Sequence, residues 1–146
     1  MADLRYGPFA SEDQTDLVAL YRSVGWSIYA DEPARLMQAI QASDWVLCAW
    51  QEDQLVGLAR ALTDGVSVTY LQDVLVHPDH QRRGIGRALL TRWLSEHEDV
   101  RQRVLLTDDR PEQKALYRSM GFHRVGPGTE SPLNAYVYIV GADLPV

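Results

Sequence analysis

The chain has 146 residues, of which 46% are hydrophobic and 23% are charged, and its formal net charge is −6. These values predict one ordinary globular domain over residues 1–146. An acidic chain without an extended basic face is unsuited to nucleic acid, and no apolar run approaches the ~20 residues of a membrane span. The N-terminus has no secretory signal, and the one cysteine, Cys48, lies in an apolar strand. We therefore expect a cytoplasmic protein without disulfides, in which this thiol belongs to the core.

The first part of the chain predicts helices followed by a pair of antiparallel strands. Apolar periodicity and turn residues indicate a strand at 4–9, a helix from Ser11 to Gly25 with Gln14 placed for a capping box, an aromatic loop at 26–29, a helix opening at Pro33, and strands at 45–50 and 55–62.

The second part predicts alternating strands and helices. The pattern indicates a strand at 66–76, a helix after Gly86, a strand at 103–107, a helix from Pro111, and strands at 122–125 and 136–140. The alternation implies parallel pairing of 66–76 with 103–107. We expect a single α/β domain of mixed α+β character, with a mixed, mostly antiparallel sheet of six or seven strands and helices on both faces.

A short segment after the 66–76 strand has the chemistry of a phosphate site. The strand ends at His77-Pro78, and Gln81-Arg82-Arg83-Gly84-Ile85-Gly86 leads into the next helix. Glycines let a backbone approach a ligand closely, and the unpaired N–H groups and dipole at a helix start favour an anion. Four arginines (Arg82, Arg83, Arg87 and Arg92) lie within eleven residues with no carboxylate among them. A plain tight turn is the alternative.

Two common phosphate motifs do not fit this segment. A dinucleotide-binding fingerprint needs glycine or alanine where Leu89 stands, and the Gly-Lys-Ser/Thr of a P-loop is absent from the sequence. A Gln-x-x-Gly-x-Gly turn between a strand and a helix remains. The histidines His77 and His80 are three residues apart, but no cysteine or carboxylate set completes a metal site, so we expect none.

Together with the preceding Val74-Leu75-Val76-His77-Pro78, this turn resembles the acetyl-CoA motif of the GCN5-related N-acetyltransferases (GNAT family). Downstream, residues 115–122 are similar to the family's A-x-Y-x-x-x-G-F segment. The resemblance implies a GNAT-like domain that uses acetyl-CoA as cosubstrate. It implies cofactor contacts from Val74, Leu75, Val76, Gln81, Arg82, Arg83, Gly84, Ile85, Gly86, Arg87 and Tyr117.

The resemblance also suggests catalytic roles. Tyr117 matches the family residue at the thiol end, where it would hydrogen-bond the leaving thiolate, and the backbone N–H groups of Leu75 and Val76 would polarise the thioester carbonyl. The usual family Glu is replaced by an apolar residue near Leu105, and the usual Asn by Arg110. Asp73 is then the leading candidate for general base, with a structural hydrogen bond as the equal alternative. Asp108 and Asp109 are second choices.

The acceptor is expected to be a primary amine of a small molecule. Trp26 and Tyr29 could flank it, with Asp73 nearby, and this region has a looser resemblance to arylalkylamine N-acetyltransferases. An arylalkylamine or polyamine is therefore the expected substrate, and relatives suggest a homodimer. Two alternatives stay open: a protein N-terminal or lysine acetyltransferase, and a non-catalytic acyl-CoA-binding module.

Overall fold

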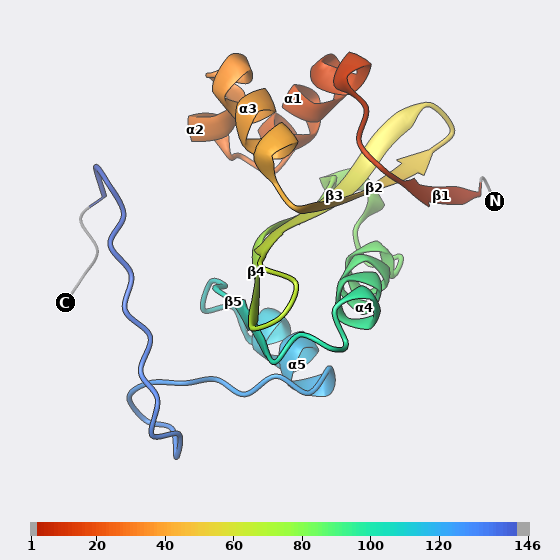
Figure 1. The fold of residues 1–146 in the computed structure, drawn as a ribbon. Helices are drawn as coiled ribbons and strands as arrows, with labels where there is room; N and C mark the ends of the chain where they lie inside the picture. The colour runs from red at the N-terminus through yellow and green to blue at the C-terminus, as the bar shows by residue number, and fades with distance from the viewer. Residues whose placement is uncertain (1–2, 143–146) are drawn as a thin grey trace. The chain divides into compact units, whose positions relative to one another are not determined.

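The computed structural model describes residues 3–142 and divides the chain into two compact units, one ending at Leu106 and one beginning at Thr107 (Figure 1). Within the described residues, the first unit carries a five-stranded sheet. Its strands are β1 (Leu4–Gly7), β2 (Trp45–Gln51), β3 (Gln54–Thr63), β4 (Val68–Val76) and β5 (Gln102–Leu105), and their order in the sheet follows their order in the chain. Each pair is antiparallel except β4 with β5, which is parallel.

The connections follow from local chemistry. The Asp64 carboxylate accepts hydrogen bonds from the N–H groups of Val66, Ser67 and Val68, which closes the tight β3–β4 turn. Two parallel strands cannot be joined by a hairpin, so a helix crosses between β4 and β5. That helix is α4 (Ile85–Glu96). The predicted mixed sheet and the parallel pairing are confirmed.

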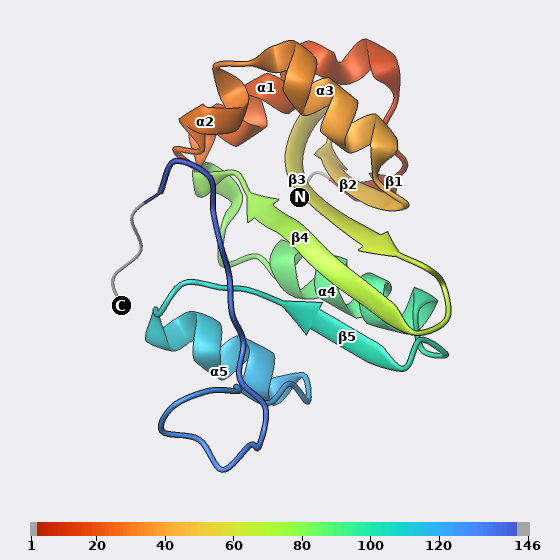
Figure 2. The same ribbon diagram turned by 60° about the vertical axis from the view of Figure 1, so that its left-hand side comes forward.

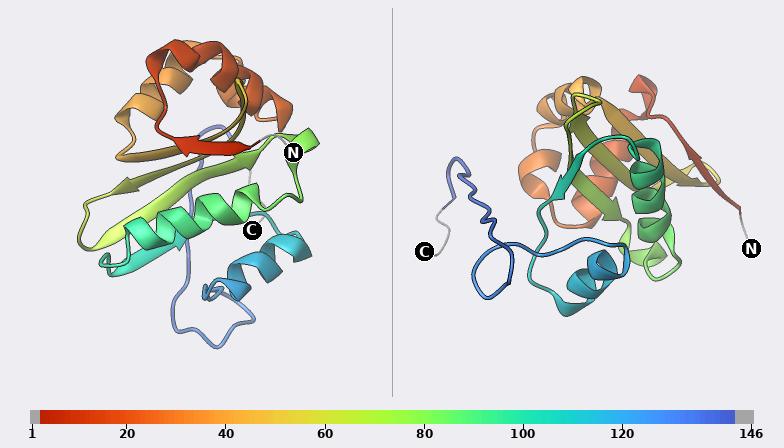
Figure 3. Two further views of the ribbon diagram at one scale, coloured as in Figure 1. Left: turned by 90° about the vertical axis from the view of Figure 1, so that its right-hand side faces the viewer. Right: turned by 60° about the horizontal axis from the view of Figure 1, so that its bottom comes forward.

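Helices cover both faces of the sheet, as predicted (Figure 3). On one face lie α1 (Gln14–Ser23), α2 (Ser27–Ala30) and α3 (Pro33–Ala42), and on the other lies α4. The predicted inward stripes are buried, with Leu17, Leu20 and Tyr21 on α1 and Leu36, Met37 and Ile40 on α3. These side chains pack with Cys48, Leu58 and Leu75 of the sheet into one core. Burying this surface is the main term that stabilises the unit.

The opposite face packs closely because β3 carries a glycine. A Cβ on Gly57 would lie 2.9 Å from Cγ2 of Ile85, a buried side chain of α4. Further along α4, the Trp93 indole donates a buried hydrogen bond of 3.0 Å to the Thr69 hydroxyl.

Among residues 3–142, none of the helices is both long and apolar enough to cross a bilayer.

Two local expectations in the first unit were wrong in detail. Residues 11–13 form a 3-10 turn, η1 (Ser11–Asp13), and it is the Asp13 carboxylate, in place of Gln14, that accepts the Ala10 N–H at 3.2 Å. The expected aromatic loop at 26–29 is largely helical, because the Trp26 carbonyl accepts the N–H groups of Tyr29 and Ala30 and starts α2.

The second unit contains α5 (Pro111–Ser119), which starts at a proline, as predicted, and is followed by Gly121 in a left-handed conformation. The strands expected at 122–125 and 136–140 are absent, so the described sheet has five strands, fewer than the six or seven predicted. Gly126 and Gly128 both have positive φ, with Pro127 between them. The positive φ angles at 126 and 128 bend the chain directly after residues 122–125. An extended segment becomes a strand only when a neighbouring strand pairs its backbone N–H and C=O groups, and neither 122–125 nor 136–140 has such a partner in the described structure.

Gly57→Ala tests the close approach of α4 to the sheet. We expect it to lower the free energy of unfolding by about 1–3 kcal/mol, because the new methyl group overpacks against buried Ile85. Urea denaturation measures this. Gly7→Ala is the control, since a Cβ there meets no atom within 4 Å among the described residues. An equal effect of both substitutions would contradict the explanation.

Candidate functional site

One edge of β4 is left without a strand partner at its C-terminal end. The parallel pairing of β4 with β5 stops at Leu71, opposite Leu105, whereas β4 continues to Val76 (Figure 2). Residues 72–76 therefore present an edge that no strand of the first unit pairs. Such an edge offers backbone N–H and C=O groups to a ligand.

Backbone alternation decides which residues face this edge. The His77 N–H donates to the Val56 carbonyl of β3 at 2.8 Å. Successive residues of a strand direct these groups to opposite sides, so those of Val74 and Val76 point away from β3. The Gln81 side-chain amide donates to the Val76 carbonyl at 3.1 Å, which agrees with that direction. The N–H of Leu75, expected to face the ligand, points to β3 instead, and Val74 offers its N–H in its place.

A β-bulge lies where the β5 pairing ends. Arg60 pairs with Asp73 and Ala61 pairs with Leu71, which leaves Gln72 as an extra residue in β4. An extra residue reverses the alternation of side chains. Before the bulge Thr69 meets α4, whereas after it Asp73 meets α1. The bulge thus brings the carboxylate to the side of the sheet that carries α1 and α2.

Asp73 is held in a buried polar network. Its Oδ2 accepts the Tyr21 hydroxyl at 2.9 Å and Nε of Arg60 at 2.6 Å, and Arg60 also donates to the Ser43 hydroxyl at 3.3 Å. Asp73 is 4% exposed and Arg60 is 6% exposed. Burial, followed by the Asp73 charge, raises the pKa of Tyr21 well above its usual value, so this phenol stays protonated. The carboxylate is compensated by Arg60, as a buried charge requires.

The two aromatic residues expected at the acceptor adjoin this network. The rings of Trp26 and Tyr29 both contact Tyr21 edge-on, with centroids 5.8 and 5.7 Å away, and lie 6.4 Å from each other. Both are half-buried and pack against the core. The structure thus brings together the three residues Trp26, Tyr29 and Asp73 through Tyr21, which the sequence did not single out.

The glycine-rich turn opens α4 beside the end of β4. Arg82 and Gly84 have left-handed backbone, with φ of 63° and 82°. The first N–H to donate within the helix is that of Ala88, to Gly84 at 2.9 Å, so those of Ile85 and Gly86 precede the helical ladder. These N–H groups and the helix dipole suit a phosphate.

Gly86 supplies a test of whether a ligand fits here. Its φ is not positive, and a Cβ would come no closer than 3.8 Å to an atom of the described chain, Cγ2 of Val76. Neither backbone strain nor internal packing requires this glycine, although it weakens the helix. The space beside Gly86 leaves room for a ligand to approach the backbone closely, so the residues of the turn fit a phosphorylated ligand.

The arginines of the turn differ in their surroundings. Nη1 of Arg83 donates to Oε1 of Gln51 at 2.6 Å and lies 3.0 Å from Nδ1 of His80. Arg83 is exposed, as Arg82 and Arg87 are. Within residues 3–142, no three His, Cys, Asp or Glu side chains are grouped so as to hold a metal ion.

Tyr117 lies on α5 in the second unit. Its ring contacts Phe122 edge-on at 5.9 Å, and burial raises its pKa although a hydrogen bond with the Thr107 side chain lowers it.

The two other candidates for the general base form salt bridges: Asp108 with Arg110 at 2.8 Å and Asp109 with Lys114 at 2.6 Å. Hydrogen bonds from these cations lower the pKa of each carboxyl, which makes both weak proton acceptors.

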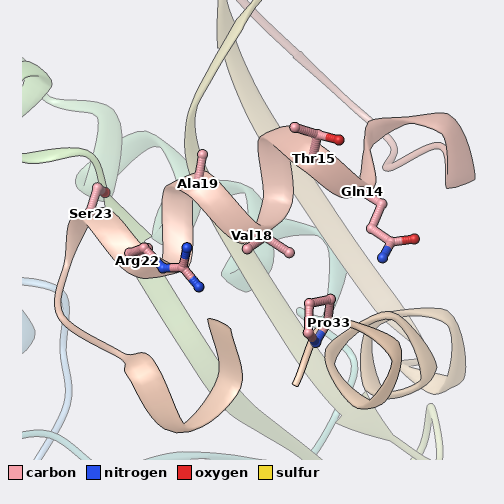
Figure 4. A pocket seen from close by; sticks show the side chains of 7 residues that line it. All are labelled: Gln14, Thr15, Val18, Ala19, Arg22, Ser23 and Pro33. Atoms are coloured by element: carbon pink, nitrogen blue, oxygen red, sulfur yellow. The ribbon is translucent and has the colours of Figure 1, made fainter. Parts of the chain in front are cut away.

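A hollow of about 590 Å³ lies on the outer side of α1 (Figure 4). It is lined by Gln14, Thr15, Val18, Ala19, Arg22, Ser23 and Pro33. None of the expected site residues is among them, so this hollow adds nothing to the site at β4.

Sequence reasoning missed Arg60 as well as Tyr21. Arg60 was detectable as one cation inside the apolar 55–62 strand, since a charge buried in a sheet needs a partner. Tyr21 resembled an ordinary core residue, and its hydroxyl gains a role only through the position of Asp73.

A mixed α/β domain in which an unpaired strand edge leads to a glycine-rich turn at a helix start has features that suit a phosphorylated ligand. The chain belongs to the GNAT acetyltransferase family, because the profile described as "Acetyltransferase (GNAT) domain" matches residues 42–124. An uncharacterized N-acetyltransferase of Prochlorococcus marinus is 33% identical over 115 residues, which cover 75% of this chain and 62% of the relative. The chain thus spans about three fifths of the curated relatives it matches first.

Solved structures agree on the fold. A GNAT-family acetyltransferase of Streptococcus pneumoniae superposes with a TM-score of 0.78 at 29% identity, over 95% of this chain and 98% of the other. The PaiA N-acetyltransferase of Thermoplasma acidophilum, solved in complex with coenzyme A, superposes with a TM-score of 0.69 at 16% identity. The superposition covers 83% of this chain and 90% of the other. The second likeness supports the fold alone.

Removing the Asp73 carboxylate should destabilise the protein strongly. We expect Asp73→Ala to lower the free energy of unfolding by about 3–5 kcal/mol, because it leaves the Arg60 charge buried without a partner. The double substitution Asp73→Leu with Arg60→Met should lose clearly less. Urea denaturation measures both. A double variant less stable than Asp73→Ala would show that Arg60 does not depend on this carboxylate.

Proposed function

We propose that this protein transfers an acetyl group from acetyl-CoA to the primary amine of a small molecule. The observation that carries the proposal is the unpaired edge of β4 leading to the phosphate-binding turn of α4. Family membership supports the acyl chemistry, since the profile covers this whole region.

In this proposal, the N–H groups of Ile85 and Gly86 hold the pyrophosphate of CoA, with Gln81, Arg82, Arg83, Gly84 and Arg87 completing the turn. The backbone groups of Val74 and Val76 hold the pantetheine arm along the open edge, and the Val74 N–H is placed to polarise the thioester carbonyl. The Leu75 side chain packs in the core behind them. When bound, acetyl-CoA supplies an activated acyl group.

The acceptor amine must lose a proton before it can attack. For an amine with a pKa of about 10.4, deprotonation at pH 7 costs about 4.6 kcal/mol. Asp73 is the candidate base that lies on β4, yet its Oδ2 already accepts two hydrogen bonds. This arrangement supports a positioning role for Asp73, with the proton passing to water.

A pH–rate profile of Asp73→Asn separates the two roles. Asparagine keeps the shape of the side chain but cannot accept a proton. If Asp73 positions Tyr21 and Arg60, we expect a lower turnover with the acidic limb of the profile at its original pH. An acidic limb that disappears or moves to higher pH would identify Asp73 as the base instead.

Tyr117 is proposed to hydrogen-bond the leaving thiolate. Its raised pKa keeps the phenol protonated at neutral pH, which suits a hydrogen-bond donor and disfavours complete proton transfer. We expect Tyr117→Phe to lower turnover by about tenfold to a thousandfold with little change in the affinity for CoA. Release of free CoA thiol measures turnover, and an unchanged turnover number would remove this role.

Trp26 and Tyr29 are proposed to contact the acceptor. Half-buried aromatic rings suit an arylalkylamine or the methylene chain of a polyamine, and the net charge of −6 favours a cation.

A module that binds acyl-CoA without catalysis is the second candidate function. It is favoured by the pairing of Asp73, Asp108 and Asp109, each with a neighbouring cation. Homodimer formation and a cytoplasmic location stay predictions; light scattering tests the first.

A panel of amines decides between these functions. Acetyl-CoA is incubated with tryptamine, phenethylamine, spermidine and a lysine peptide, and free thiol is followed. The buried Cys48 thiol does not interfere, because burial raises its pKa to about 12. We expect release that depends on one class of small amine. Release with the peptide alone supports a protein acetyltransferase, and CoA binding without release supports the binding-only module.

Gly86→Ala tests the cofactor site independently of the acceptor. The added methyl group meets no close atom of the described chain, so stability should stay the same or rise slightly. The affinity for CoA should fall by about tenfold to a hundredfold, because the methyl group occupies the space left for the ligand. Calorimetric titration measures the affinity and urea denaturation the stability. Unchanged CoA affinity would place the cofactor elsewhere.

A further inference from the structure

Arg83 is an exposed residue of the phosphate turn, and its guanidinium contacts side chains of two other segments. Its Nη1 donates to Oε1 of Gln51 at 2.6 Å and lies 3.0 Å from Nδ1 of His80. A guanidinium can only donate, so the imidazole nitrogen is the acceptor in that contact. Arg83 therefore links three segments: the turn, the 3-10 turn η2 (Pro78–His80) and the end of β2.

Gln51 is a firm point of attachment. It pairs with Leu4 of β1 on one side and with Gln54 of β3 on the other, so strands flank it in the sheet. A residue whose backbone is paired on both sides can hold the turn against the sheet through its side chain.

The turn needs such a hold because one of its residues, Arg82, has strained backbone. Arg82, a non-glycine residue, has φ of 63°, and Gly84 has φ of 82°. A left-handed conformation at a non-glycine residue costs about 1 kcal/mol or more and persists only where surrounding contacts enforce it. Arg83 stands between these two residues, and its own φ is not positive. Backbone that alternates in this way makes successive N–H groups converge on an anion.

We infer that Arg83 is a positioning residue: it braces the left-handed turn against β2 through Gln51, and so holds the turn's N–H groups ready for a phosphate. This inference rests on the proposed binding of CoA and gives Arg83 a contact within the protein in place of a direct contact with the phosphate. A direct phosphate ligand would instead use its guanidinium on the cofactor, and the contact with Gln51 would compete with binding.

Gln51, the uncharged hydrogen-bond partner of Arg83, provides the decisive test. Calorimetric titration with CoA is carried out on the wild type, Arg83→Ala, Gln51→Ala and the double variant, with Arg35→Ala as a charge-matched control on an exposed part of α3. We expect Gln51→Ala to weaken CoA binding about tenfold, as Arg83→Ala does, and the double variant to be no weaker than Arg83→Ala. Arg35→Ala should bind like the wild type. Unchanged or tighter binding by Gln51→Ala would overturn the inference.

A second measurement needs no ligand. Amide hydrogen exchange at Ala88, whose N–H donates to the Gly84 carbonyl of the turn at 2.9 Å, should be faster in both Gln51→Ala and Arg83→Ala than in Arg35→Ala, because the turn loses its hold on β2. Unchanged exchange in these variants would overturn the bracing role, whatever the protein binds. Failure of the wild type to bind CoA, with exchange altered as expected, would instead overturn the proposed function and leave the brace established.

Discussion

The extra residue in β4 is the constraint on which the rest of the site depends. At Gln72 the strand gains one residue relative to β3, and its pairing with β5 ends one residue earlier. Reversed alternation after that point turns Asp73 toward α1 and leaves the backbone of Val74 and Val76 facing an open edge. One irregularity thus sets both the polar network on one face and the backbone groups at the edge that no strand of the first unit pairs.

The buried network limits what the carboxylate can do. A charge with 4% exposure persists only beside a partner, and Arg60 fills that role from the neighbouring strand. Tyr21 then links the pair to the aromatic rings of Trp26 and Tyr29. The same contacts that make Asp73 tolerable in the core reduce its availability as a proton acceptor, which connects the stability of the first unit with its chemistry.

Much of the first unit could be predicted from the sequence. Apolar periodicity placed α1, α3, β2, β3 and α4 within a few residues, because each buries one regular stripe or face. The turn between β4 and α4 was also predicted, because its glycines set the local backbone geometry, and its binding of a phosphate stays a prediction. Residues 122–125 and 136–140 have the composition of strands, yet they form none in the described structure. A strand depends on a partner that composition does not supply.

The sequence by itself determined the mixed α/β class, the glycine-rich turn before α4 and the likeness to GNAT proteins, because these follow from short-range patterns of residue type. Only the tertiary structure decided that Arg60 and Tyr21 hold Asp73, that Val74 replaces Leu75 at the open edge, and that Arg83 reaches Gln51. Each of these depends on pairing register or on contacts between residues far apart in the chain. A shift of one residue in the ladder would reverse them without changing any local pattern.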